Sequence, residues 1–143
     1  MSTFMLGRGE TLIRDQPGVW YHRGYSRYGY PMWGRLILTN KRFIFVQQEV
    51  VERGGIISKK KELRTVGAKI NVPVESVLMS SMETRMRKKN TIDEPPSLFS
   101  KEQYDVLIVS LDTPEGQENP SFEVSDAQGW ATAVQRATGG ETV

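Results

Sequence analysis

The segment Leu36–Val46, LILTNKRFIFV, constrains the fold of this chain most strongly. Two apolar runs flank a polar step, and Asn40 tolerates the positive φ that a two-residue hairpin turn at Asn40 and Lys41 requires. Side chains alternate between faces in that register, so Thr39 and Arg42 lie on one face. The opposite face is apolar and is formed by Leu36, Leu38, Phe43 and Phe45. The sequence therefore predicts a hairpin that buries this face, with Arg42 pairing with Thr39 or a neighbouring acid.

Six further segments show the composition or alternation of β-strands. Tyr104–Leu111 is apolar on both sides, which is typical of a central strand. Ser121–Ser125 directs Phe122 and Val124 inward and Glu123 outward. Together with the first strand of the hairpin, these segments predict seven strands. The other four segments are Val19–His22, Phe43–Val51, Leu63–Val72 and Val77–Met86.

One amphipathic helix is predicted near the C-terminal end, at about residues 126–138. Ser125 followed three residues later by Gln128 matches a capping box, and Gly139 and Gly140 end the helix. Apolar residues recur at helical spacing, and Trp130 is the only large one among them. We therefore expect this stripe to pack against a sheet rather than against a cofactor.

Two segments are predicted to be mobile loops. The first covers about residues 53–61, RGGIISKKK, and the second covers about residues 87–101 and contains Pro95 and Pro96. Loops of this length are either functional or disordered. The 143 residues contain no internal repeat, and residues 1–143 are predicted to form a single domain.

Composition limits the chemistry and the cellular setting of the chain. It contains no cysteine, which excludes disulfides, thiolate nucleophiles and cysteine-ligated metals. We find no secretory signal and no apolar run near the ~20 residues of a membrane-spanning helix, so we expect a cytoplasmic protein that meets membranes only peripherally. The net charge of +2 conceals ten basic and three acidic residues between Arg53 and Lys89, against one lysine and seven acids between Lys101 and Asp126. The molecule is therefore expected to be bipolar.

The sequence shows no constellation of catalytic residues. His22 is the only histidine, and a lone histidine of this kind is more often a hydrogen-bonded strand residue than a base or a metal ligand. There is no G-x-S-x-G motif, no P-loop and no carboxylate cluster at a metal-ligand spacing. We predict that the protein is not an enzyme and carries no cofactor and no metal.

Four stretches of the chain resemble the GRAM branch of the pleckstrin-homology-like superfamily: GETLIRDQPGVWYHRG, GRLILTNKRFIFV, INVPVESVLM and FEVSDAQGWATAVQRA. The hairpin matches the pattern G-x-L-x-L-T-N-x-R-h-x-F (h, apolar), and Trp130 matches a tryptophan in the final helix. The resemblance implies a mainly β fold, a bent antiparallel barrel of about seven strands in two packed sheets, capped by one C-terminal α-helix. Two segments depart from the family pattern: RGYSRYGYPMW, which is rich in tyrosine and glycine, and the 87–101 connection, which looks inserted.

The binding prediction rests on where the basic residues fall in an antiparallel meander. The turns after the first and third strands project from the same end, so Arg23 and Arg27 are expected to share a rim with Lys59, Lys60 and Lys61. Members of the pleckstrin-homology-like superfamily commonly bind phosphoinositide headgroups between these two loops. We predict a non-enzymatic module that binds an anionic lipid headgroup or membrane surface, or a protein partner. Aromatic residues that would lie at the membrane interface are Tyr25, Tyr28, Tyr30 and Trp33.

Two alternatives stay open. The stretch RGYSRYGYPMWGR interleaves arginine with aromatic residues, as surfaces that stack single-stranded nucleic acid do. The acidic C-terminal third opposes a polyanion, which disfavours nucleic acid as the partner. Edge strands of a small barrel are also open pairing sites, so the chain is a candidate for a self-associating scaffold that forms a homo-oligomer.

Overall fold

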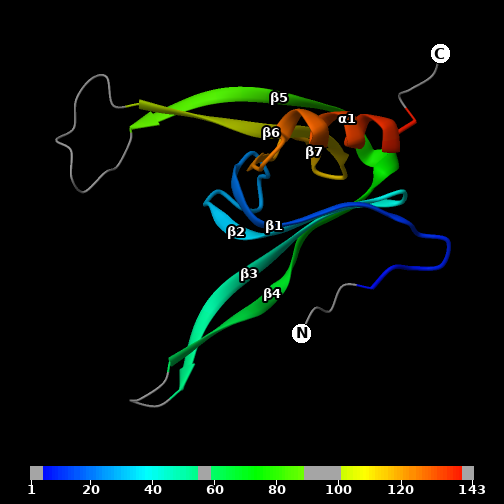
Figure 1. The fold of residues 1–143 in the computed structure, drawn as a ribbon. Coiled ribbons are helices and arrows are strands. Elements are labelled where there is room, and N and C mark those ends of the chain that lie inside the picture. Colours follow the sequence, from blue (N-terminus) through cyan, green and yellow to red (C-terminus); the bar gives the residue numbers. More distant parts are fainter. Residues whose placement is uncertain (1–4, 55–58, 89–100, 140–143) are drawn as a thin grey trace.

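The computed structural model describes residues 5–54, 59–88 and 101–139, and shows a mainly β fold with one C-terminal helix (Figure 1). A 3-10 turn, η1 (Val74–Ser76), precedes the fifth strand. The described ranges contain eight strands where seven were predicted, because a short strand follows Thr113. The elements are β1 (Leu12–Arg23), β2 (Met32–Thr39), β3 (Arg42–Gly54), β4 (Lys59–Pro73), β5 (Val77–Lys88), β6 (Lys101–Thr113), β7 (Gly116–Glu118), β8 (Ser121–Glu123) and α1 (Ala127–Ala137).

The strands form one continuous antiparallel sheet in the order β4-β3-β2-β1-β8-β6-β5, with β7 paired to β6. The sheet bends over on itself, so that β1–β4 lie in one layer and β5, β6 and α1 lie in the other (Figure 1). The ring of Phe122 on β8 packs between these layers, with its centroid 5.8 Å from Tyr21 and 5.6 Å from both Phe43 and Phe45. This arrangement confirms the predicted fold class, a bent antiparallel barrel closed by a C-terminal helix.

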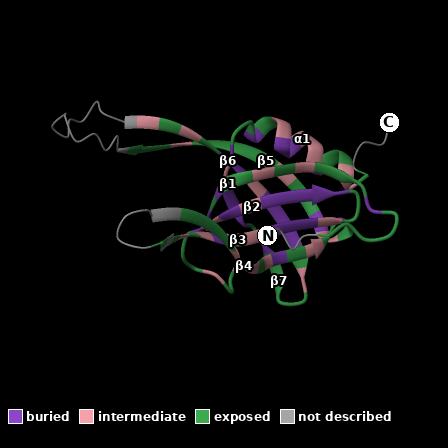
Figure 2. Ribbon diagram, turned by 60° about the horizontal axis from the view of Figure 1, so that its bottom comes forward, coloured by how far each residue is buried: buried purple, intermediate pink, exposed green. Residues whose placement is uncertain are grey.

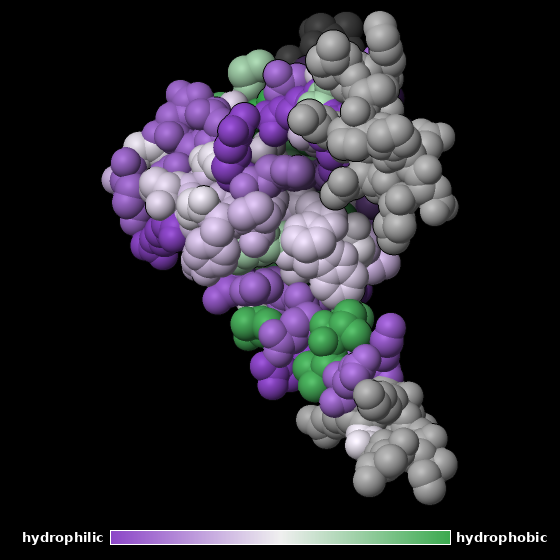
Figure 3. Space-filling model, turned by 90° about the vertical axis from the view of Figure 1, so that its left-hand side faces the viewer, coloured by the Kyte–Doolittle hydropathy of each residue, from purple (hydrophilic) through white to green (hydrophobic). Residues whose placement is uncertain are grey.

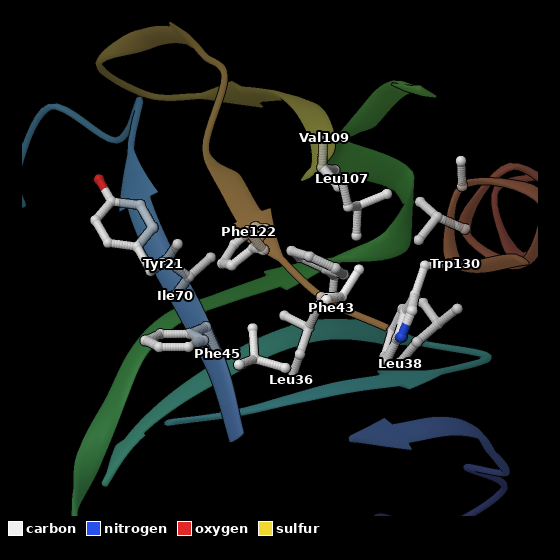
Figure 4. Packing of buried hydrophobic residues seen from close by; sticks show 14 of the residues in the cluster. Tyr21, Leu36, Leu38, Phe43, Phe45, Ile70, Leu107, Val109, Phe122 and Trp130 are labelled. Carbon is white, nitrogen blue, oxygen red and sulfur yellow. The ribbon is translucent and has the colours of Figure 1, made fainter. Parts of the chain in front are cut away.

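The predicted hairpin is formed in the predicted register, with Leu38 opposite Phe43 and Leu36 opposite Phe45. All four side chains are fully buried in the core, as Figure 4 shows. Thr39, which was predicted to share the other face with Arg42, is also fully buried. Its hydroxyl is covered because it donates a hydrogen bond to the carboxylate of Glu10.

Helix α1 covers one end of the barrel with its apolar stripe, as predicted. Trp130 is 1% exposed, and its indole N–H donates to Gln16 Oε1 at 2.7 Å. This bond gives the buried indole nitrogen the partner that it would otherwise lack. The predicted capping box is wrong. Asp126 is the N-cap and accepts from the backbone N–H of Gly129 at 3.2 Å, whereas the Ser125 hydroxyl accepts from the Gln16 side chain instead.

Strand β1 begins at Leu12, seven residues before the predicted start at Val19. Pro17 and Gly18, which ordinarily weaken a strand, directly precede that predicted start. The register of β1 against β2 shifts between Gln16 and Val19, and Gly18 has a φ of +67°. A bulge therefore absorbs both residues, and the strand continues through them.

Most of the predicted 53–61 loop is strand. Gly54 pairs with Lys59, Arg53 with Lys60, and Glu52 with Lys61, so only residues 55–58 lie outside the described part of the chain. Glu49 lies opposite Arg64 and Glu52 lies opposite Lys61, and these opposite charges favour the strands over a loop. Arg53 and Lys60, which lie opposite each other, have the same sign. In the predicted 87–101 loop, residues 87, 88 and 101 are in strands and residues 89–100 lie outside the described residues.

The ends of the β3–β4 and β5–β6 hairpins project from the barrel on the same side of the molecule (Figure 1). Buried residues concentrate in the barrel, and the projecting ends are exposed or intermediate (Figure 2). The barrel is thus a compact support for two extended antiparallel arms.

Candidate functional site

The turn between β2 and β3 is occupied by internal contacts. Arg42 donates to both oxygens of Glu10, from Nε at 2.8 Å and from Nη2 at 2.7 Å, and the backbone N–H of Gly7 donates to Oε1 at 2.7 Å. The hydrogen bonds from Arg42 are the main cause that lowers the pKa of Glu10 from 4.5 to about 2, against the opposing effect of burial. Asn40 also bonds the backbone of Gly9 and Thr11. The most specific motif in the sequence is therefore structural, and the prediction that Arg42 pairs with an acid is confirmed.

The loop between β1 and β2 is fastened to the opposite layer of the sheet. The Ser26 backbone N–H donates to Glu118 Oε2 at 2.9 Å, and Arg27 forms an ion pair with Glu115 at 3.0 Å. Arg27 thus has a carboxylate partner within the fold. Arg23, the other arginine of the predicted rim, is exposed.

The predicted interfacial aromatic residues differ in their surroundings. Tyr25 and Tyr28 stack on each other with ring centroids 5.9 Å apart and pack against the core. Tyr30 is 57% exposed, and Trp33 is partly buried opposite Trp20 in the β1–β2 pairing. Only Tyr30 of the four is well exposed, so Tyr25 and Tyr28 have a structural role.

The predicted rim is not assembled as expected. The β1–β2 loop and the β3–β4 hairpin do project from the same end of the barrel, but Figure 1 shows the end of β3–β4 well apart from that loop. The loop bends toward β6 and β7, while β3 and β4 extend away from the barrel. Lys61 is exposed near the end of β4; the side chains of Lys59 and Lys60 lie outside the described residues, although their backbones pair with β3.

The part of β3–β4 beyond the barrel, residues 48–54 and 59–66, is a two-stranded structure that we term the ribbon. Pairing of β3 with β2 ends at Gln47, whereas pairing with β4 continues for seven residues to Gly54, or about 23 Å. Val50 and Leu63 face each other on the ribbon and are 54% and 51% exposed. Figure 3 shows apolar side chains among hydrophilic ones on this narrow part of the molecule.

A pocket of about 280 Å³ lies where the ribbon leaves the barrel. Two register shifts in the β3–β4 pairing, after Phe45 and after Gln47, bend the sheet at this point. Gln48 is 7% exposed, and its Oε1 is buried without a hydrogen-bond partner among the described residues. The sequence did not predict this pocket. Its one local sign in the sequence is the pair Gln47 and Gln48, which interrupts the apolar residues of β3. The lining residues are Met5, Arg35, Arg42, Ile44, Val46, Gln48, Thr65, Gly67, Ala68 and Asn71.

His22 belongs to a closed network on the outer surface of the barrel. Its Nε2 lies 3.0 Å from Glu123, which also receives two hydrogen bonds from Arg87, at 2.9 and 3.0 Å. Burial acts to raise the pKa of Glu123, but the hydrogen bonds from Arg87 and His22 outweigh it and lower that pKa. Arg87 lies over the ring of Tyr104, 4.4 Å from its centroid, and bonds Glu102. His22 lines neither the pocket at the base of the ribbon nor a second pocket beside α1.

Two negative findings apply to the described residues. No group of three or more histidine, aspartate or glutamate side chains gathers there in a way that would hold a metal ion. The one α-helix in the described ranges is too short and too polar to cross a membrane.

Comparison with known proteins identifies no family for this chain. No family model matches the chain, and no curated protein matches it. A crystal structure of the DH/PH domains of p115-RhoGEF is similar, with a TM-score of 0.46 and 10% sequence identity over 91% of this chain. The match covers 31% of that chain, so this protein spans less than a third of its length. The assignment to the GRAM branch stays a prediction.

Proposed function

We propose that this protein is a non-catalytic binding module whose ribbon docks on an anionic membrane surface. The observation that carries the proposal is the ribbon itself, which extends about 23 Å beyond the barrel and bears an exposed apolar pair, Val50 and Leu63, behind a basic end. Interfacial contact of this kind combines apolar burial with attraction to anionic headgroups.

Basic residues dominate the end of the ribbon. The chain there carries Arg53, Lys59, Lys60 and Lys61 against Glu52 and Glu62, which leaves a net charge of +2 for residues 52–62. Each net positive charge near an anionic leaflet contributes about 1 kcal/mol, so electrostatics supplies about 2 kcal/mol, or roughly a 30-fold gain in affinity. Partial burial of Val50 and Leu63 adds about 1 kcal/mol each. The result is weak, reversible and salt-sensitive binding.

The other candidate residues are less suited to membrane binding, because they already have partners within the fold. Arg27 is already paired with Glu115, and Tyr25 and Tyr28 pack against the core. His22 is held by Glu123 in the ion-pair network described above. The ribbon therefore combines basic residues with exposed apolar area more fully than the β1–β2 loop does.

Co-sedimentation with phosphatidylcholine vesicles, with and without phosphatidylserine, tests the proposal. We expect binding to the anionic vesicles at low ionic strength, and its loss at high ionic strength. The triple variant Lys59→Ala/Lys60→Ala/Lys61→Ala should bind at least tenfold more weakly.

The control variant removes three positive charges at the opposite end of the molecule, in Arg8→Ala/Lys41→Ala/Arg136→Ala. Both triple variants have the same formal net charge, so a difference between them reports the position of the charge and not its amount. Equal losses in the two variants, or no binding to anionic vesicles at low salt, would overturn the proposal.

A further inference from the structure

Strand β5 forms one edge of the sheet and pairs with β6 alone. The first residues of β5 lie near α1, where the Ser80 hydroxyl donates to the backbone oxygen of Ala131 at 2.6 Å. Farther along, β5 carries exposed apolar side chains, with Met82 38% and Met86 57% exposed. A long, partly apolar edge strand presents unpaired backbone groups to another strand.

Among the described residues, no third strand pairs with the outer part of β5 and β6, residues 84–88 and 101–105. Pairing of β6 with β8 begins at Val106, which lies opposite Glu83 of β5. The described residues of β6 before Val106 therefore pair only with β5. A pair of antiparallel strands on its own is marginally stable in water, and three or more strands are needed for independent stability. This arm would gain stability from one more strand at the β5 edge.

The sequence of this edge is complementary to itself. Residues 82–86 read Met-Glu-Thr-Arg-Met. If two copies pair antiparallel with Thr84 opposite Thr84, each Met82 faces a Met86, and each Glu83 faces an Arg85. Within residues 82–86, antiparallel pairing therefore places an apolar residue opposite an apolar one and an acidic residue opposite a basic one on both sides of Thr84.

We propose that two copies of this chain form a symmetric dimer by antiparallel pairing of their β5 edges, with the twofold axis at Thr84. Such an isologous contact uses the same patch on both subunits and closes after two copies. The two β5–β6 arms become a four-stranded sheet, and the methionines of both copies gather on one of its faces.

Charge on the other face fits the same register. Within one chain Arg85 already bonds Glu83, with Nη2 3.0 Å from Oε2, and the Glu83 side chain is 49% exposed. In the dimer each Glu83 also faces Arg85 of the partner subunit, so four charges alternate in sign across the axis. The inference does not depend on the proposed membrane function, because the ribbon lies at the opposite edge of the sheet.

Sedimentation velocity over a range of concentrations tests dimer formation. We expect the mass to rise from 16.2 kDa to twice that value as the concentration increases. Glu83→Arg and Arg85→Glu should each remain monomeric, because like charges then face each other across the axis. An equal mixture of the two variants should form a heterodimer, since every Arg then faces a Glu. A purely intrachain role for the Glu83–Arg85 pair does not produce this rescue, because both variants have like charges within the chain.

Single cysteines test the register, because the chain has no native cysteine. Facing residues of antiparallel strands have Cα atoms about 4.5–5.5 Å apart, within the range that a disulfide spans. Thr84→Cys should therefore cross-link into a disulfide dimer on mild oxidation, and Ser81→Cys, on the same strand, should not. A protein that stays monomeric at every concentration, or cross-linking that is equal at both positions, would overturn the proposal.

Discussion

Replacement of Glu10 by glutamine should change how stability depends on pH, because the Glu10 carboxylate is the anion that the residues beside the β2–β3 turn bind. Its side chain is 2% exposed and accepts hydrogen bonds from Arg42, Thr39 and Gly7. These contacts lower its pKa from 4.5 to about 2. A pKa that is lower in the folded than in the unfolded state means that the ionised carboxylate stabilises the fold.

The magnitude follows from the shift. About 2.5 pKa units at 1.36 kcal/mol each correspond to about 3 kcal/mol of stability. This contribution is fully present above the unfolded-state pKa, from about pH 5.5 upward. It is lost progressively as the pH falls from about 4.5 through the folded-state pKa near 2.

Urea unfolding at a series of pH values measures the effect. The difference in unfolding free energy between the wild type and Glu10→Gln should be largest near pH 6–7 and should shrink by about 3 kcal/mol as the pH approaches 2. Glu75→Gln, which removes an exposed carboxylate, serves as the control and should show a much smaller change. A Glu10→Gln difference that is the same at pH 7 and near pH 2 would refute this reasoning.

Three further predictions address packing, the pocket and the β1–β2 loop. Gly34→Ala should lower the unfolding free energy by at least about 2 kcal/mol, measured by urea unfolding, because its Cβ would lie 2.0 Å from the backbone oxygen of Val46; an unchanged midpoint would contradict this. Gln48→Met should raise the unfolding free energy by about 1 kcal/mol, since it removes a buried acceptor without a partner among the described residues; a loss of stability in the same assay would indicate that the amide is satisfied. Arg27→Ala should weaken vesicle binding less than twofold, because Arg27 pairs with Glu115; a loss as large as that of the triple lysine variant would show that the β1–β2 loop also binds the membrane.

The hairpin and the helix were predictable because their signals are local. The register of Leu36 against Phe45 follows from alternation and a two-residue turn, and the burial of Trp130 follows from helical spacing. The burial of Thr39 was not predictable, because its partner Glu10 lies 29 residues away in the chain. The Asp126 cap was missed because the capping-box spacing also fits Ser125 and Gln128.

The candidate site was predicted only in part, since it depends on how the sheet bends. Strand order correctly placed the β1–β2 loop and the β3–β4 hairpin at one end. The sequence could not show that Glu115 and Glu118 draw that loop toward β6 and β7, because these contacts span about ninety residues. It also suggested a loop at about residues 53–61, where Arg53 of β3 pairs with Lys60 of β4, and so the ribbon was not foreseen.

The central claim is that the ribbon is the part of the molecule that meets an anionic membrane. Its most direct test is a polarity-sensitive fluorophore attached at Leu63→Cys, compared with the same label at Asn40→Cys in the β2–β3 turn. Because the chain has no native cysteine, each variant carries a single label. On addition of phosphatidylserine-containing vesicles, we predict a blue shift and brightening at position 63 and no change at position 40. A response at position 40 alone, or at neither position while the protein still co-sediments with the vesicles, would contradict the claim.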